Sequence, residues 1–185
     1  MSAKNKMTGK GHRLSTFSIV LGATGSPLAA TLSFFGSTFP DSSEYIVFGK
    51  KRNRYHRRYT HWFLLWLIPA YVCFNRSGWI ITRLSALVDG HNAHYDVWSC
   101  AGFWFMGCVL HILEDAWFGT VPFLRPWKRD VGIHVFHMSK KIGEMSIGEK
   151  NFVLCCILIS SLAFAVRFFT IDGLIEFFSV LWKNL

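Results

Sequence analysis

Long apolar runs, separated by short polar stretches, dominate the pattern of this 185-residue chain. The run Val97–Leu113 contains one titratable side chain, His111, and the run Val153–Val166 contains no charge. A third run, Trp62–Phe74, is apolar throughout. A helix that crosses a bilayer needs about 20 mostly apolar residues, so each run crosses only together with its flanking residues. The pattern predicts a helical membrane protein.

The first apolar segment, residues 14–39, differs from the others because Gly22, Gly25 and Pro27 interrupt it. Basic residues lie on both sides of the segment, so the positive-inside rule places both of its ends on the cytoplasmic side. A hairpin or re-entrant pair of half-helices that turns between Gly22 and Pro27 satisfies this constraint. Broken helices of this kind are tolerated at membrane depth when other protein segments bury them.

Three continuous helices are expected after this hairpin, over residues 60–74, 97–118 and 151–171. Pro69 is expected to kink the first of them, because proline removes a backbone donor and its ring clashes with the preceding turn. We therefore predict a single all-α domain, residues 1–185, that forms a multi-pass helical membrane protein. It would have about three full spanning helices and a broken or re-entrant N-terminal helical hairpin.

The formal net charge of +9 comes from 20 Lys and Arg against 11 Asp and Glu. On a soluble protein this charge would favour nucleic acid as the partner, but here the basic residues cluster beside apolar segments. They concentrate in residues 1–13, 50–58 and 125–150. All three segments should then face the cytoplasm, which predicts a bacterial inner-membrane protein with a cytoplasmic N-terminus. The expected partners are membrane lipids with anionic headgroups and no nucleic acid, and an oligomer or a partner subunit is left open.

Histidines and carboxylates stand at the ends of these apolar runs. His111 and Asp115 are four residues apart, so a helix places them on one face, with Glu114 adjacent. They are either a solvated helix end or half of a metal site. A carboxylate inside a membrane is costly, so it should be paired, protonated or bound to a metal.

Other histidines and an aspartate also stand at the ends of apolar segments. The topology predicted from charge brings all of these residues to the cytoplasmic side. His56 and His61 flank the entry to the second helix, where they are either part of a basic interfacial stretch or ligands. The full set is His12, Asp41, His56, His61, His111 and Asp115. Mixed histidine and carboxylate ligands suit zinc, manganese or iron. Six ligands exceed the needs of one four-coordinate zinc, so one or two ions are expected.

Four segments carry a resemblance to a known family: GHRLSTFSIVLGA, FPDSSEYI, YHRRYTHWFLL and LHILEDAWFGTVPFLRPW. Over about residues 11–127 their order resembles that of the YdjM-like family, LexA-regulated inner-membrane proteins held to be metal-dependent hydrolases. That family is remotely similar to zinc-dependent phospholipase C enzymes, which have an all-helical fold. The resemblance implies that the zinc ligands are His12, Asp41, His61, His111 and Asp115, with His56 as a ligand or a supporting neighbour.

The chain departs from the family pattern at several positions. Ser43 stands where the family has a second aspartate, and Glu44 lies beside it. This change puts a second metal in doubt or shifts a ligand role to Glu44. Trp62 replaces a serine, and Arg125 interrupts an apolar stretch before Pro126.

These features favour a membrane-bound, metal-dependent hydrolase that acts on a phosphoester of a lipid or lipid-linked substrate. Asp41 or Glu114 would act as the general base. Cations near the site would hold phosphate: Arg57, Arg58, Arg125, Lys128 and Arg129. The alternative is a non-catalytic membrane subunit or scaffold in which a metal only joins helices. A transport role is less favoured, because the middles of the apolar runs lack polar residues.

The loop Asp89–Asp96 also carries histidines, His91 and His94. In the charge-based topology it lies on the periplasmic side, away from the six residues above, and it is interpreted as a polar loop.

Overall fold

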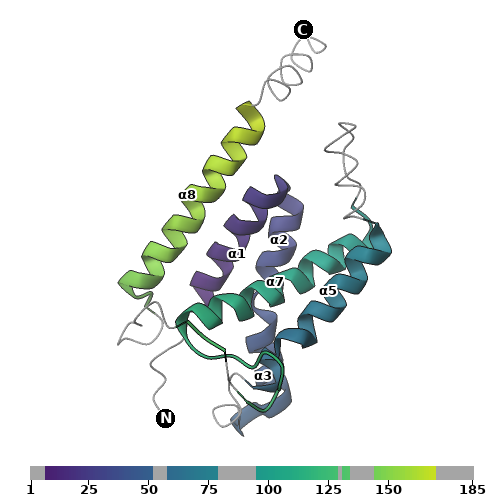
Figure 1. Ribbon diagram of the computed structural model, residues 1–185, viewed down its shortest axis with the longest axis vertical. Coiled ribbons are helices and arrows are strands. Elements are labelled where there is room, and N and C mark those ends of the chain that lie inside the picture. The colour runs from purple at the N-terminus through teal and green to yellow at the C-terminus, as the bar shows by residue number, and fades with distance from the viewer. Residues whose placement is uncertain (1–6, 52–57, 79–94, 129–130, 134–143, 170–185) are drawn as a thin grey trace.

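The described part of the chain folds into helices joined by short turns (Figure 1), as a computed structural model shows. The α-helices are α1 (Gly9–Thr24), α2 (Pro27–Gly36), α3 (Phe39–Phe48), α5 (Phe63–Ser77), α7 (Val97–Phe118) and α8 (Ile147–Phe169). Two short 3-10 turns are η1 (Gly49–Lys51) and η2 (Tyr59–His61). The structure describes residues 7–51, 58–78, 95–128, 131–133 and 144–169. The prediction of an all-α fold is confirmed for these residues.

The predicted break in the first apolar segment is confirmed, and its position follows from local backbone chemistry. Gly25 ends α1 with a φ of 68°, the left-handed conformation that glycine adopts without steric cost. The Ser26 side chain then accepts a hydrogen bond from the Ala29 N–H and caps α2, which has Pro27 in its first turn. α1 and α2 therefore run antiparallel and pack side by side (Figure 1).

α7 is the central helix, and its neighbours approach it closely because it carries small residues. α5 and α2 both pack extensively against α7, while α8 packs on α1. A Cβ atom on Gly107 would collide with the backbone carbonyl of Ser33, and one on Gly36 would collide with that of Trp104. α2 and α7 thus meet backbone to backbone at these glycines. In the same contact the Cys108 thiol lies 3.2 Å from the Gly36 carbonyl oxygen.

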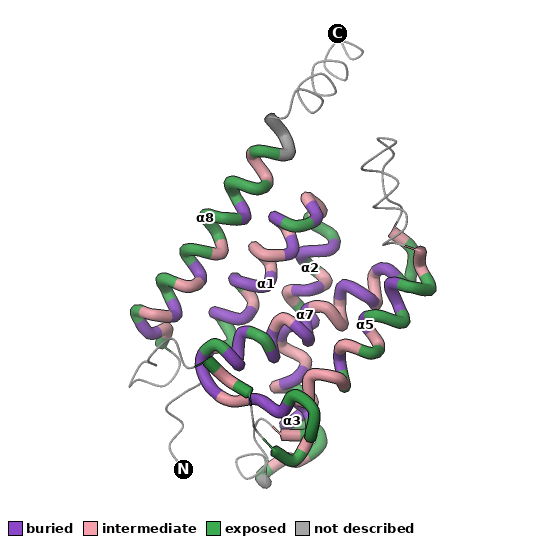
Figure 2. The backbone as a smooth tube through the Cα atoms, in the orientation of Figure 1, coloured by how far each residue is buried: buried purple, intermediate pink, exposed green. Residues whose placement is uncertain are grey.

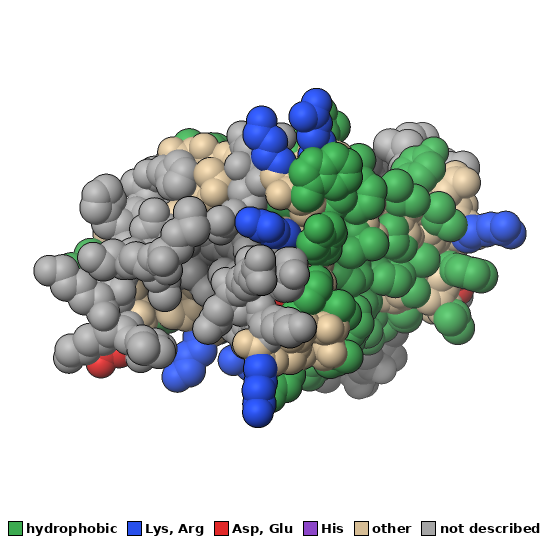
Figure 3. Space-filling model, turned by 90° about the horizontal axis from the view of Figure 1, so that it is seen from below, with side chains coloured by type: hydrophobic (Ala, Val, Ile, Leu, Met, Phe, Trp, Pro, Cys, Tyr) green, Lys and Arg blue, Asp and Glu red, His purple; other side chains and the backbone are tan. Residues whose placement is uncertain are grey.

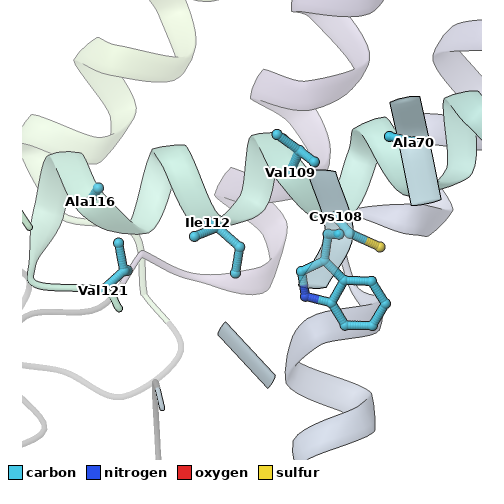
Figure 4. Packing of buried hydrophobic residues seen from close by; sticks show 7 residues of the cluster. Ala70, Cys108, Val109, Ile112, Ala116 and Val121 are labelled. Carbon is cyan, nitrogen blue, oxygen red and sulfur yellow. The ribbon is translucent and has the colours of Figure 1, made fainter. Parts of the chain in front are cut away.

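A hydrophobic cluster fixes how α7 turns relative to α5 (Figure 4). Cys108, Ile112 and Ala116 lie one turn apart along α7 and are buried against Trp66 and Ala70 of α5. Residues at this spacing share one face of a helix. His111 and Asp115 are offset from this face by one residue, so packing against α5 aims them at α1, α3 and η2 instead.

Two helices are long and apolar enough to cross a membrane: Val97–Phe118 and the Ile147–Val166 part of α8. The prediction of about three full spans is therefore supported for two helices within the described residues. α5 has 15 residues, which at 1.5 Å per residue extend only about 22 Å, short of the roughly 30 Å hydrocarbon core. The apolar character that continues beyond Ser77 falls in residues 79–94, which lie outside the described chain.

Many residues on the outer faces of α5 and α8 are exposed (Figure 2), and large apolar residues are among them. Leu154, Leu158 and Leu162 of α8 are exposed, as are Leu65 and Ile68 of α5. Only 11% of the candidate span in α8 is buried against other parts of the protein. Such surfaces would be unfavourable in water but match lipid tails, so they are expected to face the bilayer.

Several segment ends meet at one end of the helix bundle, the lower end in Figure 1. The start of α1, all of α3, the start of α5 and the end of α7 lie toward it, and the start of α8 contacts the start of α1. We refer to it as the site end. The basic segments predicted to be cytoplasmic adjoin these same helix ends in the sequence.

The close approach of α2 and α7 predicts that Gly107→Ala destabilises the fold. The added methyl has no room against the Ser33 backbone, so the two helices must separate, at a cost of about 1–3 kcal/mol. Thermal unfolding of the purified protein in detergent, followed by circular dichroism, should show a lower midpoint. Gly9→Ala is the matched control, because a Cβ there meets nothing within 4 Å. Equal midpoints for the two variants would contradict the packing described here.

Candidate metal centre

Three imidazoles and two carboxylates converge at the site end. They come from four elements: His12 from α1, Asp41 from α3, His61 from η2, and His111 and Asp115 from α7. The four residues other than Asp41 are at most 1% exposed. The Asp41 side chain is 22% exposed. Among the described residues, the cluster is therefore buried except at Asp41.

The distances within the cluster are those of a ligand sphere. His61 Nε2 lies 3.3 Å from His111 Nε2, and His12 Nε2 lies 3.3 Å from Asp115 Oδ1. His61 Nε2 also lies 3.5 Å from Asp115 Oδ2 and 3.5 Å from Asp41 Oδ1. Strong hydrogen bonds would be shorter. Tetrahedral ligands placed about 2.0–2.1 Å from zinc are themselves about 3.3 Å apart, which agrees with the observed spacing.

The chemistry of the donor atoms also suits a cation. The Nε2 atoms of His61 and His111 face each other at 3.3 Å, where one can donate to the other, or both lone pairs can point at one cation between them. His12 Nε2 is buried and makes no hydrogen bond of good geometry among the described residues, although Asp115 Oδ1 lies 3.3 Å away. A buried polar atom left without a partner costs about 1–3 kcal/mol. A metal ion between these groups would satisfy them together, so the residues fit the expected metal.

The ligand atoms form two overlapping groups that share His111. One is His12, His111 and Asp115, and the other is Asp41, His61 and His111, with the atoms of each within 4.8 Å of one another. The two oxygens of Asp115 face different nitrogens: Oδ1 faces His12, while Oδ2 faces His61 and His111. A carboxylate in this position can serve one ion or bridge two. The cluster could thus hold an ion of the expected kind, and the number of ions stays a prediction.

Glu114 lies behind His12 and orients it. Its Oε2 is 2.7 Å from His12 Nδ1, and its Oε1 accepts hydrogen bonds from the Ser15 hydroxyl at 2.6 Å and the Thr16 hydroxyl at 3.1 Å. A carboxylate on the outer nitrogen of a histidine fixes the tautomer and turns the inner nitrogen toward the metal. Both Glu114 oxygens are therefore engaged away from the exposed side of the cluster.

The same carboxylates control the protonation of His12, which precedes the first apolar segment. Burial alone would lower the His12 pKa, but hydrogen bonding and attraction to Asp115 and Glu114 outweigh burial and raise the pKa to about 9. Without a metal, His12 therefore carries a proton at pH 7. A metal must displace that proton, so binding should weaken as the pH falls below about 9.

His61 is supported from its outer side as well. Its Nδ1 lies 3.2 Å from the Thr60 hydroxyl and 3.9 Å from Glu44 Oε1, and Glu44 is fully buried. The indole of Trp66 donates to the Thr60 carbonyl at 2.7 Å, which holds this turn against α5. Glu44 thus stands behind a candidate ligand, while the Ser43 hydroxyl donates to the Pro40 carbonyl within α3.

The remaining residues singled out from the sequence are placed less fully. His56, Arg57 and Arg129 lie outside the described residues, as do His91 and His94. Arg58 directly precedes η2, which carries His61. Arg125 and Lys128 are exposed in the segment after α7. That segment is attached to the start of α5 by hydrogen bonds from Phe63 N–H to the Pro122 carbonyl and from the Trp62 indole to the Phe123 carbonyl.

Glu149 is a residue that the sequence analysis missed. It is fully buried in the first turn of α8, and its Oε1 accepts hydrogen bonds from the Thr8 N–H and the Thr8 hydroxyl at the start of α1. Gly11 leaves the space that the carboxylate occupies. Glu149 thereby ties α8 to the helical turn that precedes His12. In the sequence, Glu149 could have been singled out only as an acidic residue in a basic segment just before the last apolar run.

Comparison with known proteins gives one family match. The family model described as YdjM inner membrane protein matches residues 7–173 of the chain. The match covers every residue of the cluster. No curated protein and no solved structure matches the chain.

The geometry predicts that the protein binds about one or two zinc-like ions and that His111→Ala or Asp115→Ala removes most of the bound metal. Both residues share a ligand group with His12, and His111 belongs to both groups. Elemental analysis of protein purified in detergent without chelator measures the metal content. His91→Ala is the matched control and should keep the wild-type content. Wild-type protein that holds no metal and takes up none from added zinc would contradict the prediction.

Proposed function

The chain belongs to the family of YdjM inner membrane proteins, and from that premise we propose that it is a membrane-bound, metal-dependent hydrolase. The proposed substrate is a phosphoester in a lipid or a lipid-linked molecule. One observation carries the proposal: four buried ligands and one partly exposed ligand, Asp41, form a cluster that is open on a single side. Hydrolytic metal sites keep an open position for water and substrate, whereas structural sites are closed.

Zinc or a similar ion, when bound, supplies Lewis-acid activation of water and of the phosphoryl oxygen. The three imidazoles and Asp115 would hold it from the buried side, and water would reach it from the side of Asp41. Asp41 stands on the exposed side, where it can take the proton that the attacking water loses. Glu114, the other candidate for general base, already accepts two hydroxyl hydrogen bonds and pairs with His12. We therefore favour Asp41 as the base and Glu114 as the group that orients His12.

Cations on neighbouring segments supply the phosphate contacts in this proposal. Arg58 lies three residues before His61, and Arg125 and Lys128 are exposed on the segment attached to the start of α5. An arginine can hold two phosphate oxygens with one planar fork, while lysine acts as a point charge. Arg57 and Arg129, outside the described residues, would extend the same group.

A structural role for the metal is the second candidate, and the burial of four of the five ligands favours it. In that case the ion would join α1, α3, η2 and α7 without chemistry, and the protein would be a membrane subunit or scaffold. The two candidates differ in whether a ligand position is left for water. Turnover of a substrate separates them directly.

The proposed reaction predicts turnover of a phosphoester by purified protein supplied with zinc or manganese. Mixed phospholipids, a water-soluble phosphodiester and a phosphomonoester are the substrates to test. Asp41→Asn, His61→Ala and Asp115→Asn should each lower the rate by at least about 100-fold, because each removes a metal ligand or the base. Ser33→Ala, buried between α2 and α7, is the control and should stay active.

Turnover that survives all three substitutions would mean that the reaction occurs elsewhere. Absence of turnover on every substrate, combined with a metal ligated entirely by protein, would support the structural role.

We further propose that the site end faces the cytoplasm, because the basic segments adjoin it. In a background without the five native cysteines, single cysteines at Ser43 or Ser139 should resist a membrane-impermeant thiol reagent in intact cells. A cysteine at Asn92 should react. The reverse pattern would invert the orientation, and a reactive Ser43 position by itself would refute the proposal that the α1–α2 hairpin enters and leaves on the cytoplasmic side.

A further inference from the structure

The last turn of α3 carries three consecutive apolar side chains that none of the described residues covers. Tyr45, Ile46 and Val47 are 64%, 76% and 65% exposed. The inward face of α3 is already occupied by Asp41 and the buried Glu44, so rotation of the helix could not bury the other three. An uncovered apolar surface of this kind marks a binding site for a protein or a membrane. We call these three residues the α3 tip.

The α3 tip adjoins the exposed side of the candidate metal centre. A shallow depression next to Asp41 is lined by Asp41, Ser42, Tyr45 and Ile46. Two members of the α3 tip therefore border the place from which Asp41 can be reached. Whatever covers the α3 tip also controls access to that carboxylate.

Charge next to the α3 tip favours an anionic lipid leaflet as the occupant. The exposed Lys50 follows the tip within one turn, and it opens the basic stretch that runs to Arg58. Apolar residues followed directly by lysines are typical of a segment that enters the membrane interface while its cations stay at the phosphates. Viewed from the site end, hydrophobic side chains gather on one face with Lys and Arg around them (Figure 3).

Other occupants fit this surface less well. A second copy of the chain would bring two strongly basic stretches together, because each copy carries a net charge of +9. The exposed leucines of α8 are already expected to face a bilayer beside the bundle. The α3 tip lies at the site end, so contact with the surface of that same bilayer would cover it without any further partner.

We propose that the α3 tip inserts into the headgroup region of an anionic leaflet and delivers lipid headgroups to Asp41 from within that leaflet. Tyr45 and Ile46 would then contact the part of the lipid that stays in the membrane, which makes them determinants of substrate choice. The membrane contact stands by itself, whereas the delivery step rests on the proposed hydrolase function.

Quenching by brominated lipids tests the membrane contact without any assay of activity. A bimane label is attached to a single cysteine in a background without native cysteines, and the protein is placed in nanodiscs that contain brominated phosphatidylglycerol. Position 46 should be quenched several-fold more than position 10, an exposed lysine at the start of α1. Position 158, on the exposed face of α8, is the positive control.

Quenching at position 46 that is no stronger than at position 10 overturns the proposal. If the label at position 46 is quenched weakly by brominated lipid and is also protected from aqueous iodide, then a protein and not lipid covers the α3 tip.

The delivery step has its own test with two substrates. Ile46→Ser should lower turnover of a long-chain phospholipid in vesicles by about tenfold, since one apolar contact typically contributes 10- to 200-fold to discrimination. Turnover of a water-soluble phosphodiester and the metal content should not change. Leu158→Ser, on the exposed face of α8, should change neither rate.

An equal loss on both substrates would overturn the delivery step, because the substitution would then act on the metal centre itself. Absence of turnover by the wild-type protein would remove the delivery step together with the proposed function. The quenching result would still decide whether the α3 tip contacts the membrane.

Discussion

The convergence of His12, His61, His111, Asp115 and Asp41 is the interaction on which the rest of the structure depends. Imidazoles and carboxylates lose favourable hydration when they are buried, so they are retained inside a helix bundle only when they satisfy one another or a bound ion. The four contributing elements must therefore end at the same place. The α1–α2 hairpin meets this requirement, because it starts near His12 and returns α3, with Asp41, to the site end.

Two layers of contacts hold these ligands in position. Glu114 with Ser15 and Thr16 orients His12 from behind, and Thr60 with Glu44 stands on the outer side of His61. Beyond them, the glycines at 36 and 107 let α2 approach α7 closely, and the apolar contacts of α7 with α5 fix its rotation. These apolar contacts limit how far the helices can shift or rotate, and so they hold the candidate ligands in position.

The unequal exposure of the cluster links this architecture to the proposed chemistry. Asp41 alone among the five is partly exposed, and the apolar α3 tip borders it. A site that is buried within the bundle and exposed beside an uncovered apolar helix end is suited to the proposed substrate at a membrane surface. The exposed leucines of α8 and the membership in a family of inner membrane proteins are consistent with such a surface nearby.

The sequence by itself determined the helical class, the break between Gly22 and Pro27 and the family, because these depend on local periodicity, turn residues and motif order. It also identified five residues that the fold brings together, because histidines and aspartates recur at the ends of the apolar segments. Of the about three spanning helices that it predicted, two are long and apolar enough to cross a membrane within the described residues, and α5, at 15 residues, is too short by itself.

Only the tertiary structure decided which side of each ligand faces the centre. The orientation of His12 by Glu114, the place of Glu44 behind His61 and the bond from Glu149 to Thr8 join residues from separate helices. Glu149 and Thr8 are 141 positions apart, and no local pattern encodes such a contact. It arises from the packing of whole helices, because the small residue Gly11 leaves room on α1 for a side chain of α8.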